Sequence, residues 1–293
     1  MKIYLTFSIL LIIVVISISI APVKAQAGEY PPELYVGRFL IGPQAYSFNR
    51  YSFLEAVDKA KEAGANVIEA YPGQRISPDD KTPFSHDAPP SIWALAKKKL
   101  EQVGVRIVNY GVVGLGNDEA ENRKVFDFAK IMGIPIITSE PAEGSFDLLE
   151  KLVKEYNIKL AVHNHPRREN DPDYKYWDPN YVLECVKGRD PRMGACADTG
   201  HWIRSNINPL DALKILEGRI ISCHLKDLNE FGAKATDVPY GKGVTNVSEI
   251  LNELRRQGFI GNIAIEYESN WMNNVVEISE CVDFVREYGK KNP

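Results

Sequence analysis

Residues 192-RMGACADTGHW-202 join a run of small and apolar side chains to an abruptly polar ending. The run 192–197 has the length and composition of a strand that is buried on both faces. At its end, Asp198-Thr199-Gly200-His201 provides the polar residues typical of a turn and of a helix N-cap. A buried strand that leads into a helix is one unit of a parallel α/β fold.

The same succession recurs along the chain, where short apolar runs alternate with amphipathic stretches. The strand candidates are residues 39–41, 65–69, 105–109, 134–138, 159–163, 192–197, 220–224 and 263–266. The helix candidates are residues 52–60, 93–100, 125–132, 148–153, 210–216 and 247–254. Eight strand-and-helix units predict an α/β fold with a single (β/α)8 TIM-barrel domain. An open doubly wound sheet is the alternative, but no glycine-rich phosphate loop follows the first strand to support it.

The first 25 residues have the pattern of a secretory signal peptide. Met1-Lys2 gives a basic start, residues 5–20 are almost wholly apolar, and Val23-Lys24-Ala25 places small residues at a cleavage position. A membrane anchor is the alternative, but this apolar run is shorter than the roughly 20 residues that a spanning helix needs. We therefore expect an exported protein, periplasmic or secreted, without stable membrane insertion after cleavage and with the barrel in residues 26–293.

Charge and cysteine content narrow the class of partner. The formal net charge is −4, and cleavage of the leader would remove Lys2 and Lys24. Because phosphate binding needs clustered cations, this balance disfavours nucleic acid as a partner. Cys185, Cys196, Cys223 and Cys281 are too scattered for a disulfide framework or a zinc motif. The sequence leaves the oligomeric state open, a homo-oligomer included.

Polar side chains stand at the end of most predicted strands, and four of the five histidines are among them. These strand ends are 69–71, 109–110, 139–141, 163–165, 198–201, 224–227 and 266–268. Each has an ordinary explanation alone: Asp198-Thr199 caps a helix, and a buried histidine is hydrogen-bonded. A barrel, however, brings all these ends to one mouth, where gathered carboxylates are costly without a cation. Carboxylate and imidazole ligands predict a divalent metal, Mn²⁺, Co²⁺, Zn²⁺ or Mg²⁺.

Three motifs carry a family resemblance: Asp198-Thr199-Gly200-His201, His224-Leu225-Lys226-Asp227 and Ile265-Glu266. Over about residues 37–288 the chain resembles the xylose-isomerase-like TIM-barrel superfamily. That superfamily includes sugar phosphate isomerases and epimerases, and also endonuclease-IV-type AP endonucleases. Its members hold one metal with an acid on the fifth strand, Asp on the sixth, His on the seventh and Glu on the eighth. The resemblance therefore implies Asp198, His224 and Glu266 as metal ligands.

This chain departs from the family pattern on the fifth strand, where His163 replaces the usual acid. Strand alternation turns His163 and His165 to the same side, so either imidazole is a candidate ligand. Glu140, at the neighbouring strand end, is expected to supply the missing carboxylate as a further ligand. The resemblance also implies that His201 contacts substrate or a second metal. The turn itself still allows a helix cap, because Thr199 is expected to cap the following helix while Asp198 binds the metal.

The implied chemistry is proton abstraction next to a carbonyl, assisted by the metal. Glu140 or His165 is the expected base, Glu266 is both a ligand and a second acid or base, and Lys226 steadies an alkoxide. The substrate contacts are expected to come from residues at or beyond the strand ends: His201, Tyr71 and Trp177, the last within the long loop 166–180.

Three classes of function remain open. The first is a metal-dependent isomerase or epimerase of a small, non-phosphorylated carbohydrate. The second is a 3-keto-glycoside lyase or deglycosidase that uses the same site for β-elimination. The third is a sugar-binding barrel without catalysis. A nuclease is disfavoured, because its three zinc ions and basic groove need more histidines and more positive charge than this chain has.

Overall fold

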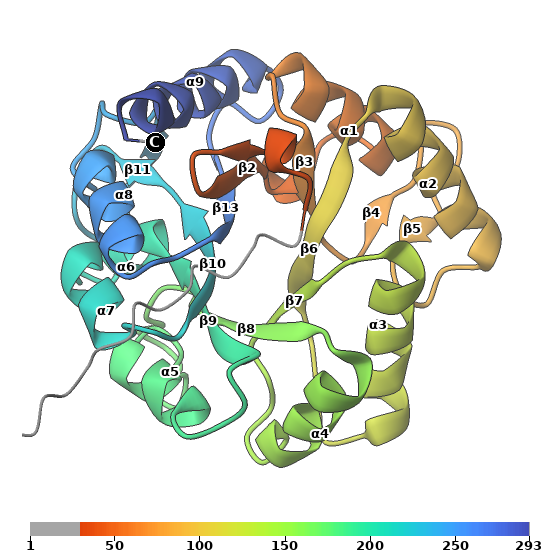
Figure 1. Ribbon diagram of the computed structural model, residues 1–293, viewed down its shortest axis with the longest axis horizontal. Helices are drawn as coiled ribbons and strands as arrows, with labels where there is room; N and C mark the ends of the chain where they lie inside the picture. The colour runs from red at the N-terminus through yellow and green to blue at the C-terminus, as the bar shows by residue number, and fades with distance from the viewer. Residues whose placement is uncertain (1–29, 293) are drawn as a thin grey trace, which may run out of the picture.

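Eight parallel strands form the centre of the molecule and helices surround them (Figure 1). The computed structural model describes residues 30–292, so the predicted signal peptide lies outside the described residues. The eight strands are β2 (Phe39–Pro43), β3 (Val67–Ala70), β6 (Arg106–Val113), β7 (Ile136–Ser139), β8 (Lys159–His163), β9 (Met193–Asp198), β10 (Ile220–Leu225) and β13 (Gly261–Ile265). Each overlaps a strand predicted from the sequence, and the predicted TIM-barrel fold is confirmed.

The strands pair in parallel in the order β2-β13-β10-β9-β8-β7-β6-β3, so neighbours in sequence are mostly neighbours in space. A short β1 (Tyr35–Val36) adds an antiparallel edge to β2. The ring closes between β2 and β3 through a single bridge, Gln44 to Glu69. At this seam Gly42 lies so near β3 that an added Cβ would fall 2.0 Å from the Val67 carbonyl oxygen.

Nine α-helices are present in residues 30–292, and six of them were predicted. The predicted six are α1 (Phe53–Glu62), α2 (Pro90–Val103), α3 (Glu119–Met132), α4 (Phe146–Tyr156), α7 (Pro209–Ile215) and α8 (Val247–Arg256). Of the other three, α6 (Thr199–Arg204) was expected only as a helix capped at Asp198-Thr199, without bounds, and α5 (Pro179–Val186) and α9 (Val275–Lys291) were not predicted. Within the described part of the chain, no helix is both long and apolar enough to cross a membrane.

Local sequence signals explain where several of these helices begin and end. Ser52 and Glu55 form a reciprocal capping box at the start of α1. Gly104 and Gly133 end α2 and α3 in the left-handed conformation, each with φ of 70°. These ends turn the chain back into the next strand, so each helix packs outside the sheet.

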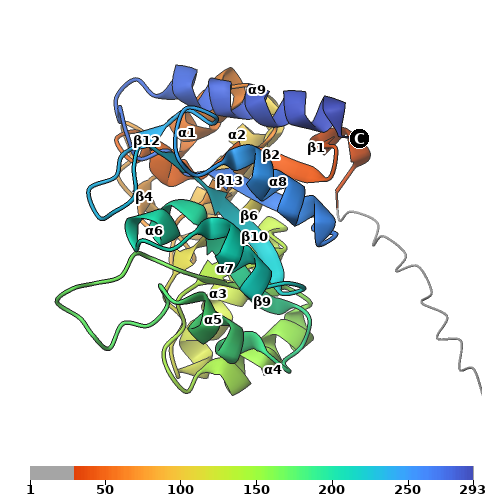
Figure 2. The same cartoon turned by 90° about the vertical axis from the view of Figure 1, so that its left-hand side faces the viewer.

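The loops at the carboxyl ends of the strands are the longer ones. Between β8 and α5, residues 164–178 form no helix or strand, as the sequence indicated. Figure 2 shows this loop projecting from the same side of the molecule as α6 and β12. The second long loop, after β10, contains a short hairpin of β11 (Asp227–Leu228) and β12 (Asp237–Val238). The two loops flank the mouth of the barrel at which the polar strand ends meet.

The close approach at the barrel seam leads to a stability prediction. Replacing Gly42 with alanine is expected to lower the free energy of unfolding by about 1 to 3 kcal/mol, because the backbone of β3 must give way. Urea denaturation measures the change. Gly114→Ala is the control, since an added Cβ there meets no atom within 4 Å. Equal loss in the two variants would contradict a tight seam.

Candidate active site

Four buried side chains from neighbouring strands converge at the mouth: His163, Asp198, His224 and Glu266. His163 and Asp198 are the last residues of β8 and β9, His224 is the last but one of β10, and Glu266 directly follows β13. One ligand atom from each of the four lies within 4.8 Å of the others. The resemblance implied Asp198, His224 and Glu266 as ligands and left His163 and His165 as alternatives; the barrel brings His163 together with the other three.

The two carboxylate oxygens of Asp198 make different contacts. Its Oδ1 accepts a hydrogen bond from the His201 backbone N–H at 2.8 Å and so caps α6. Its Oδ2 is buried, has no hydrogen-bond partner and lies 3.6 Å from His163 Nε2. The prediction that Thr199 caps this helix is wrong, because the Thr199 hydroxyl accepts from the Lys226 backbone N–H at 3.0 Å instead.

The four side chains fit a divalent cation. His163 Nε2 is buried without a hydrogen-bond partner, which is costly unless a further group satisfies it. Asp198 Oδ2 is also buried and forms no hydrogen bond, although Lys226 Nζ lies 3.1 Å from it. Two imidazoles and two carboxylates are a donor set for Mn²⁺, Co²⁺, Zn²⁺ or Mg²⁺, with no thiolate to restrict the choice. His163, Asp198, His224 and Glu266 would therefore hold such a cation.

Lys226 directly follows β10 and lies in the middle of this cluster. Its side chain is buried, and its Nζ lies 3.1 Å from Asp198 Oδ2 and 2.9 Å from Glu266 Oε2. Burial alone would lower the pKa of Lys226, but these carboxylates raise it well above its usual value. The mouth thus already contains one positive charge between the two carboxylates.

Glu69 is a functional candidate that was not singled out for a role from the sequence. Its Oε1 lies 2.8 Å from His224 Nε2, and its Oε2 accepts hydrogen bonds from Asn109 and Asn262 at 2.9 and 3.0 Å. This contact leaves His224 Nδ1 facing Glu266 Oε2 at 3.1 Å. A carboxylate that holds one imidazole nitrogen fixes the tautomer and leaves the other free for a metal. The sequence signal was the acid at the end of a buried strand, Val67-Ile68-Glu69.

The buried charges shift one another's pKa values. Burial lowers the pKa of His163, yet Asp198 and Glu140 raise it to about 9. For Glu266, burial raises the pKa, but Lys226 and His224 lower it well below the usual range. Ionised carboxylates and protonated imidazoles therefore balance one another in the described structure.

Glu140 lies beside the four-residue cluster and forms a second group with His163 and His165. Its Oε1 lies 2.5 Å from His165 Nδ1, 3.2 Å from His163 Nδ1 and 2.8 Å from the Tyr174 hydroxyl. The His165 side chain is 41% exposed, the most accessible imidazole of the group. The structure thus presents a carboxylate–imidazole pair whose imidazole faces the open mouth.

His201 lies on the other side of Asp198, among charged groups. Its Nε2 is 3.5 Å from Asp198 Oδ2, and its Nδ1 is 3.3 Å from an Arg204 nitrogen. Burial lowers the pKa of His201 well below its usual value. Arg204 also pairs with Asp237 at 2.8 Å and with Glu268 at 2.5 Å, which extends the charged network to β12.

The two aromatic residues predicted to contact substrate lie in different surroundings. Tyr71 is half-buried and meets the Tyr46 ring edge-on, with ring centroids 5.3 Å apart. Trp177 lies in the long loop after β8, with the Arg167 guanidinium 5.0 Å from its ring centroid. Neither residue contributes to the polar cluster.

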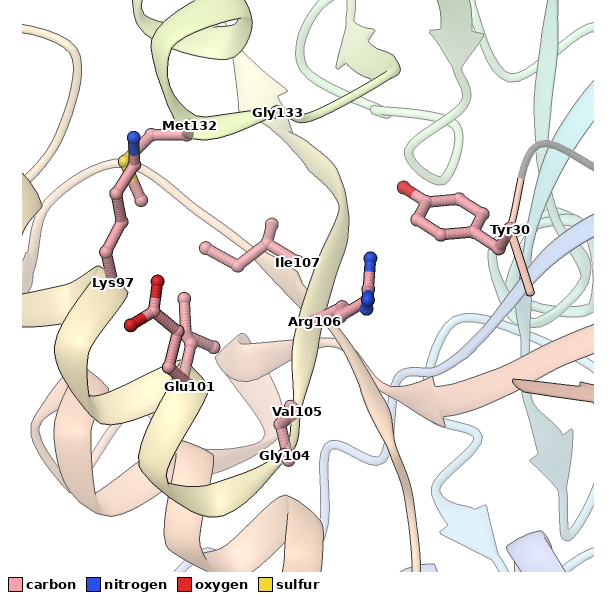
Figure 3. A pocket seen from close by; sticks show the side chains of 10 residues that line it. Tyr30, Lys97, Glu101, Gly104, Val105, Arg106, Ile107, Met132 and Gly133 are labelled. Carbon is pink, nitrogen blue, oxygen red and sulfur yellow. The ribbon is translucent and has the colours of Figure 1, made fainter. Parts of the chain in front are cut away.

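A cavity of about 640 Å³ lies away from this cluster (Figure 3). Its lining includes Gly104 and Gly133, which end α2 and α3, and Arg106, which begins β6. It therefore opens at the amino ends of the strands, opposite the mouth where barrel enzymes place their chemistry.

Comparison with known proteins agrees with this architecture. The family model described as "Xylose isomerase-like TIM barrel" matches residues 57–288, and the chain belongs to that family. The sequence has no match among the curated proteins.

Several solved structures resemble the chain. An uncharacterized protein from Parabacteroides distasonis is 33% identical, with a TM-score of 0.68 over 84% of this chain and 98% of that one. A D-tagatose 3-epimerase-like protein is 19% identical, with a TM-score of 0.65 over 86% and 98%. The IOLI protein, solved with a zinc atom, is 16% identical, with a TM-score of 0.64 over 87% and 98%. The last two likenesses show a shared fold.

The first prediction for the site concerns metal content. His224→Ala and Glu266→Gln are each expected to lose bound divalent metal, because each removes one of four converging ligands. Elemental analysis after dialysis measures the stoichiometry. His86→Ala is the control, since His86 pairs with the Tyr110 hydroxyl at 3.0 Å outside the cluster. Full metal content in His224→Ala would contradict the ligand assignment.

The second prediction concerns Glu69. Glu69→Gln is expected to weaken metal binding by about 10- to 100-fold, because His224 loses the carboxylate that holds its Nε2. A competition titration with a fluorescent chelator measures the affinity. Glu253→Gln is the matched control, a carboxylate of low exposure that pairs with Arg256 on α8. Unchanged affinity in Glu69→Gln would show that Glu69 does not support the site.

Proposed function

We propose that this chain is a metal-dependent isomerase or epimerase that abstracts a proton next to the carbonyl of a non-phosphorylated sugar. The observation that carries the proposal is the exposed His165 imidazole, paired with Glu140 beside a buried group of four metal-type ligands. A base and an electrophilic site side by side are the two parts that enolisation of a sugar needs.

His165 serves as the base in this proposal, and Glu140 positions it. With Nδ1 donating a proton to Glu140 Oε1 at 2.5 Å, His165 Nε2 is left as the acceptor. Glu140 Oε1 also accepts from the His165 backbone N–H at 2.9 Å and from Tyr174. Because these contacts engage that oxygen, the exposed imidazole is better placed than Glu140 to take the substrate proton.

The side of the cluster opposite His165 would stabilise the negative charge that develops on the substrate oxygen. A divalent cation held by His163, Asp198, His224 and Glu266 would supply Lewis acidity toward the substrate oxygens. Lys226 Nζ, between Asp198 and Glu266, is a hydrogen-bond donor fixed within the same group. Its role is to hold an oxygen that gains charge as the proton leaves.

The charge pattern supports an unphosphorylated substrate. Lys226 is paired with Asp198, Glu266 and Glu268, and Arg204 is paired with Asp237 and Glu268. These cations are already neutralised by carboxylates, so they offer little to a phosphate group. The export predicted from residues 1–25 points the same way, because sugar phosphates are cytosolic intermediates.

A 3-keto-glycoside lyase is the second candidate, and His163 favours it. A two-base epimerase uses facing acids on both sides of one carbon, and the fifth-strand acid is replaced here by His163. That imidazole faces Glu140 on one side and Asp198 on the other, so it is not free to exchange a substrate proton. A single accessible base suits proton transfer on one face, or elimination of a group from the neighbouring carbon.

Solvent exchange tests the proposal. The metal-loaded protein, incubated in D₂O with a panel of free sugars and 3-keto-glycosides, is expected to exchange a hydrogen next to the carbonyl, as read by NMR. His165→Ala is expected to retain metal and to lower the exchange rate by about 10²- to 10⁴-fold. Release of the aglycone would select the lyase over the isomerase or epimerase.

Two results would contradict this function. One is the absence of exchange with every member of the panel in protein shown to contain metal. The other is a wild-type exchange rate in His165→Ala, which would remove the base from the mechanism. His86→Ala serves as the control for loss of an imidazole outside the mouth.

A further inference from the structure

Three aromatic residues meet at one wall of the barrel mouth: Tyr46, Tyr71 and Trp271. The Tyr46 ring contacts Tyr71 and Trp271 edge-on, with centroid separations of 5.3 and 5.9 Å and interplanar angles of 78° and 89°. Tyr46 is 39% exposed, and the other two are partly exposed. We call these three residues the aromatic wall.

The aromatic wall comes from three loops at the carboxyl ends of adjacent strands. Tyr46 follows β2, Tyr71 follows β3, and Trp271 lies between β13 and α9. β2 pairs with β13 and is bridged to β3, so the three loops lie next to one another. The aromatic wall is thus built by the tertiary fold and not by one local segment.

A hydrogen-bonded connection joins the aromatic wall to the candidate catalytic cluster. Ser47, next to Tyr46, donates to the Ile265 carbonyl at 3.3 Å and accepts from the Tyr267 backbone N–H at 2.8 Å. These two backbone groups flank Glu266, a candidate metal ligand. Asn274 further fixes the loop that carries Trp271, by donating to the Ser47 carbonyl at 2.7 Å. The aromatic wall is therefore held at a set position relative to Glu266.

The other aromatic residues near the mouth differ from this group, because their rings or hydroxyls are already engaged. Arg168 lies 3.8 Å from the Tyr174 ring centroid, and the Tyr174 hydroxyl donates to Glu140. Tyr176 is buried and donates to the Pro141 carbonyl. Trp177 lies near the Arg167 guanidinium. By contrast, the described structure shows no cation against the rings of the aromatic wall.

We propose that the aromatic wall of Tyr46, Tyr71 and Trp271 is a subsite for a second ring, attached glycosidically to the sugar that reacts. Aromatic faces carry negative charge density and bind the apolar C–H face of a pyranose or the face of an aryl group. The substrate is then a glycoside rather than a monosaccharide, and because its anomeric carbon is locked, the carbonyl next to the abstracted proton is a keto group on the ring, as in a 3-keto-glycoside. This inference rests on the proposed function for the location of the reacting sugar, but the binding of the second ring can be measured separately.

The test uses matched glycosides that have no carbonyl and so cannot react. Methyl and phenyl pyranosides of glucose, galactose and xylose, and the non-reducing disaccharide derivative methyl β-cellobioside, are titrated into protein labelled with 5-fluorotryptophan. For at least one sugar, the phenyl glycoside or the disaccharide is expected to bind about tenfold more tightly than the methyl glycoside. The ¹⁹F signal of Trp271 is expected to shift, while that of Trp93, packed on Phe128 at 5.5 Å, stays in place.

Substitutions in the aromatic wall test whether these residues cause the tighter binding of glycosides with a second ring. Tyr46→Ala and Trp271→Ala are each expected to abolish the preference for the second ring and to leave the affinity for the methyl glycoside unchanged. Trp271→Phe keeps an aromatic ring and is expected to retain part of the preference for the second ring. This variant distinguishes loss of the subsite from a defect in folding. Phe231→Ala is the control, since Phe231 is 46% exposed on the loop after β10 and is not part of the aromatic wall.

Three outcomes would overturn the inference. The first is equal affinity for all members of every matched set of glycosides. The second is a Trp271 ¹⁹F signal that does not shift at saturation. The third is a preference for the second ring that survives in Trp271→Ala or is lost in Phe231→Ala. A phenyl preference without a disaccharide preference assigns the subsite to aryl aglycones, and the reverse assigns it to a second sugar. The solvent-exchange experiment can fail or succeed independently, because the probes used here do not enolise.

Discussion

Charge compensation at the barrel mouth is the constraint on which the site depends. Asp198 and Glu266 are buried, and an isolated buried carboxylate is costly. Lys226 contacts both at about 3 Å, and His163 and His224 add positive charge through raised pKa values. A divalent cation would enter a site in which charge is already balanced, so binding must displace protons or move Lys226. The ammonium is thus both a substitute for the cation and its competitor.

The network of charged and polar side chains continues from the mouth into the interior of the barrel. Beneath His224, Glu69 accepts from His224 on one oxygen and from the amides of Asn109 and Asn262 on the other. Asn109 also meets the Thr138 hydroxyl at 2.8 Å, which connects β7 to the same network. A barrel interior is normally filled by branched apolar side chains. Here one layer is polar, and it sets the orientation of the imidazole above it.

The sequence was sufficient for the fold because each buried strand is a short apolar run with polar residues at its end. It was also sufficient for the strand-end residues of the cluster, once the barrel placed those ends together. It could not give the contact between Glu69 and His224, which are 155 positions apart and meet only through the closed sheet. Lys226 was expected at a strand end as a group that steadies an alkoxide, but its burial and its ion pairs were not predicted, because its partners come from β9 and from the chain after β13. The helix α9 was missed, and most of the elements it packs against, β1, β2 and α1, lie at the far end of the chain.

Asp198 divides its two oxygens between a helix and the mouth of the barrel. Because Oδ1 is held by the first turn of α6, the torsion angles that aim Oδ2 are fixed when the chain folds. A free aspartate would lose side-chain entropy on capturing a ligand, whereas this one loses it earlier, during folding. Rotation of this carboxylate and fraying of α6 are therefore a single event. The thermal motion of a six-residue helix sets how rigidly the aspartate is aimed.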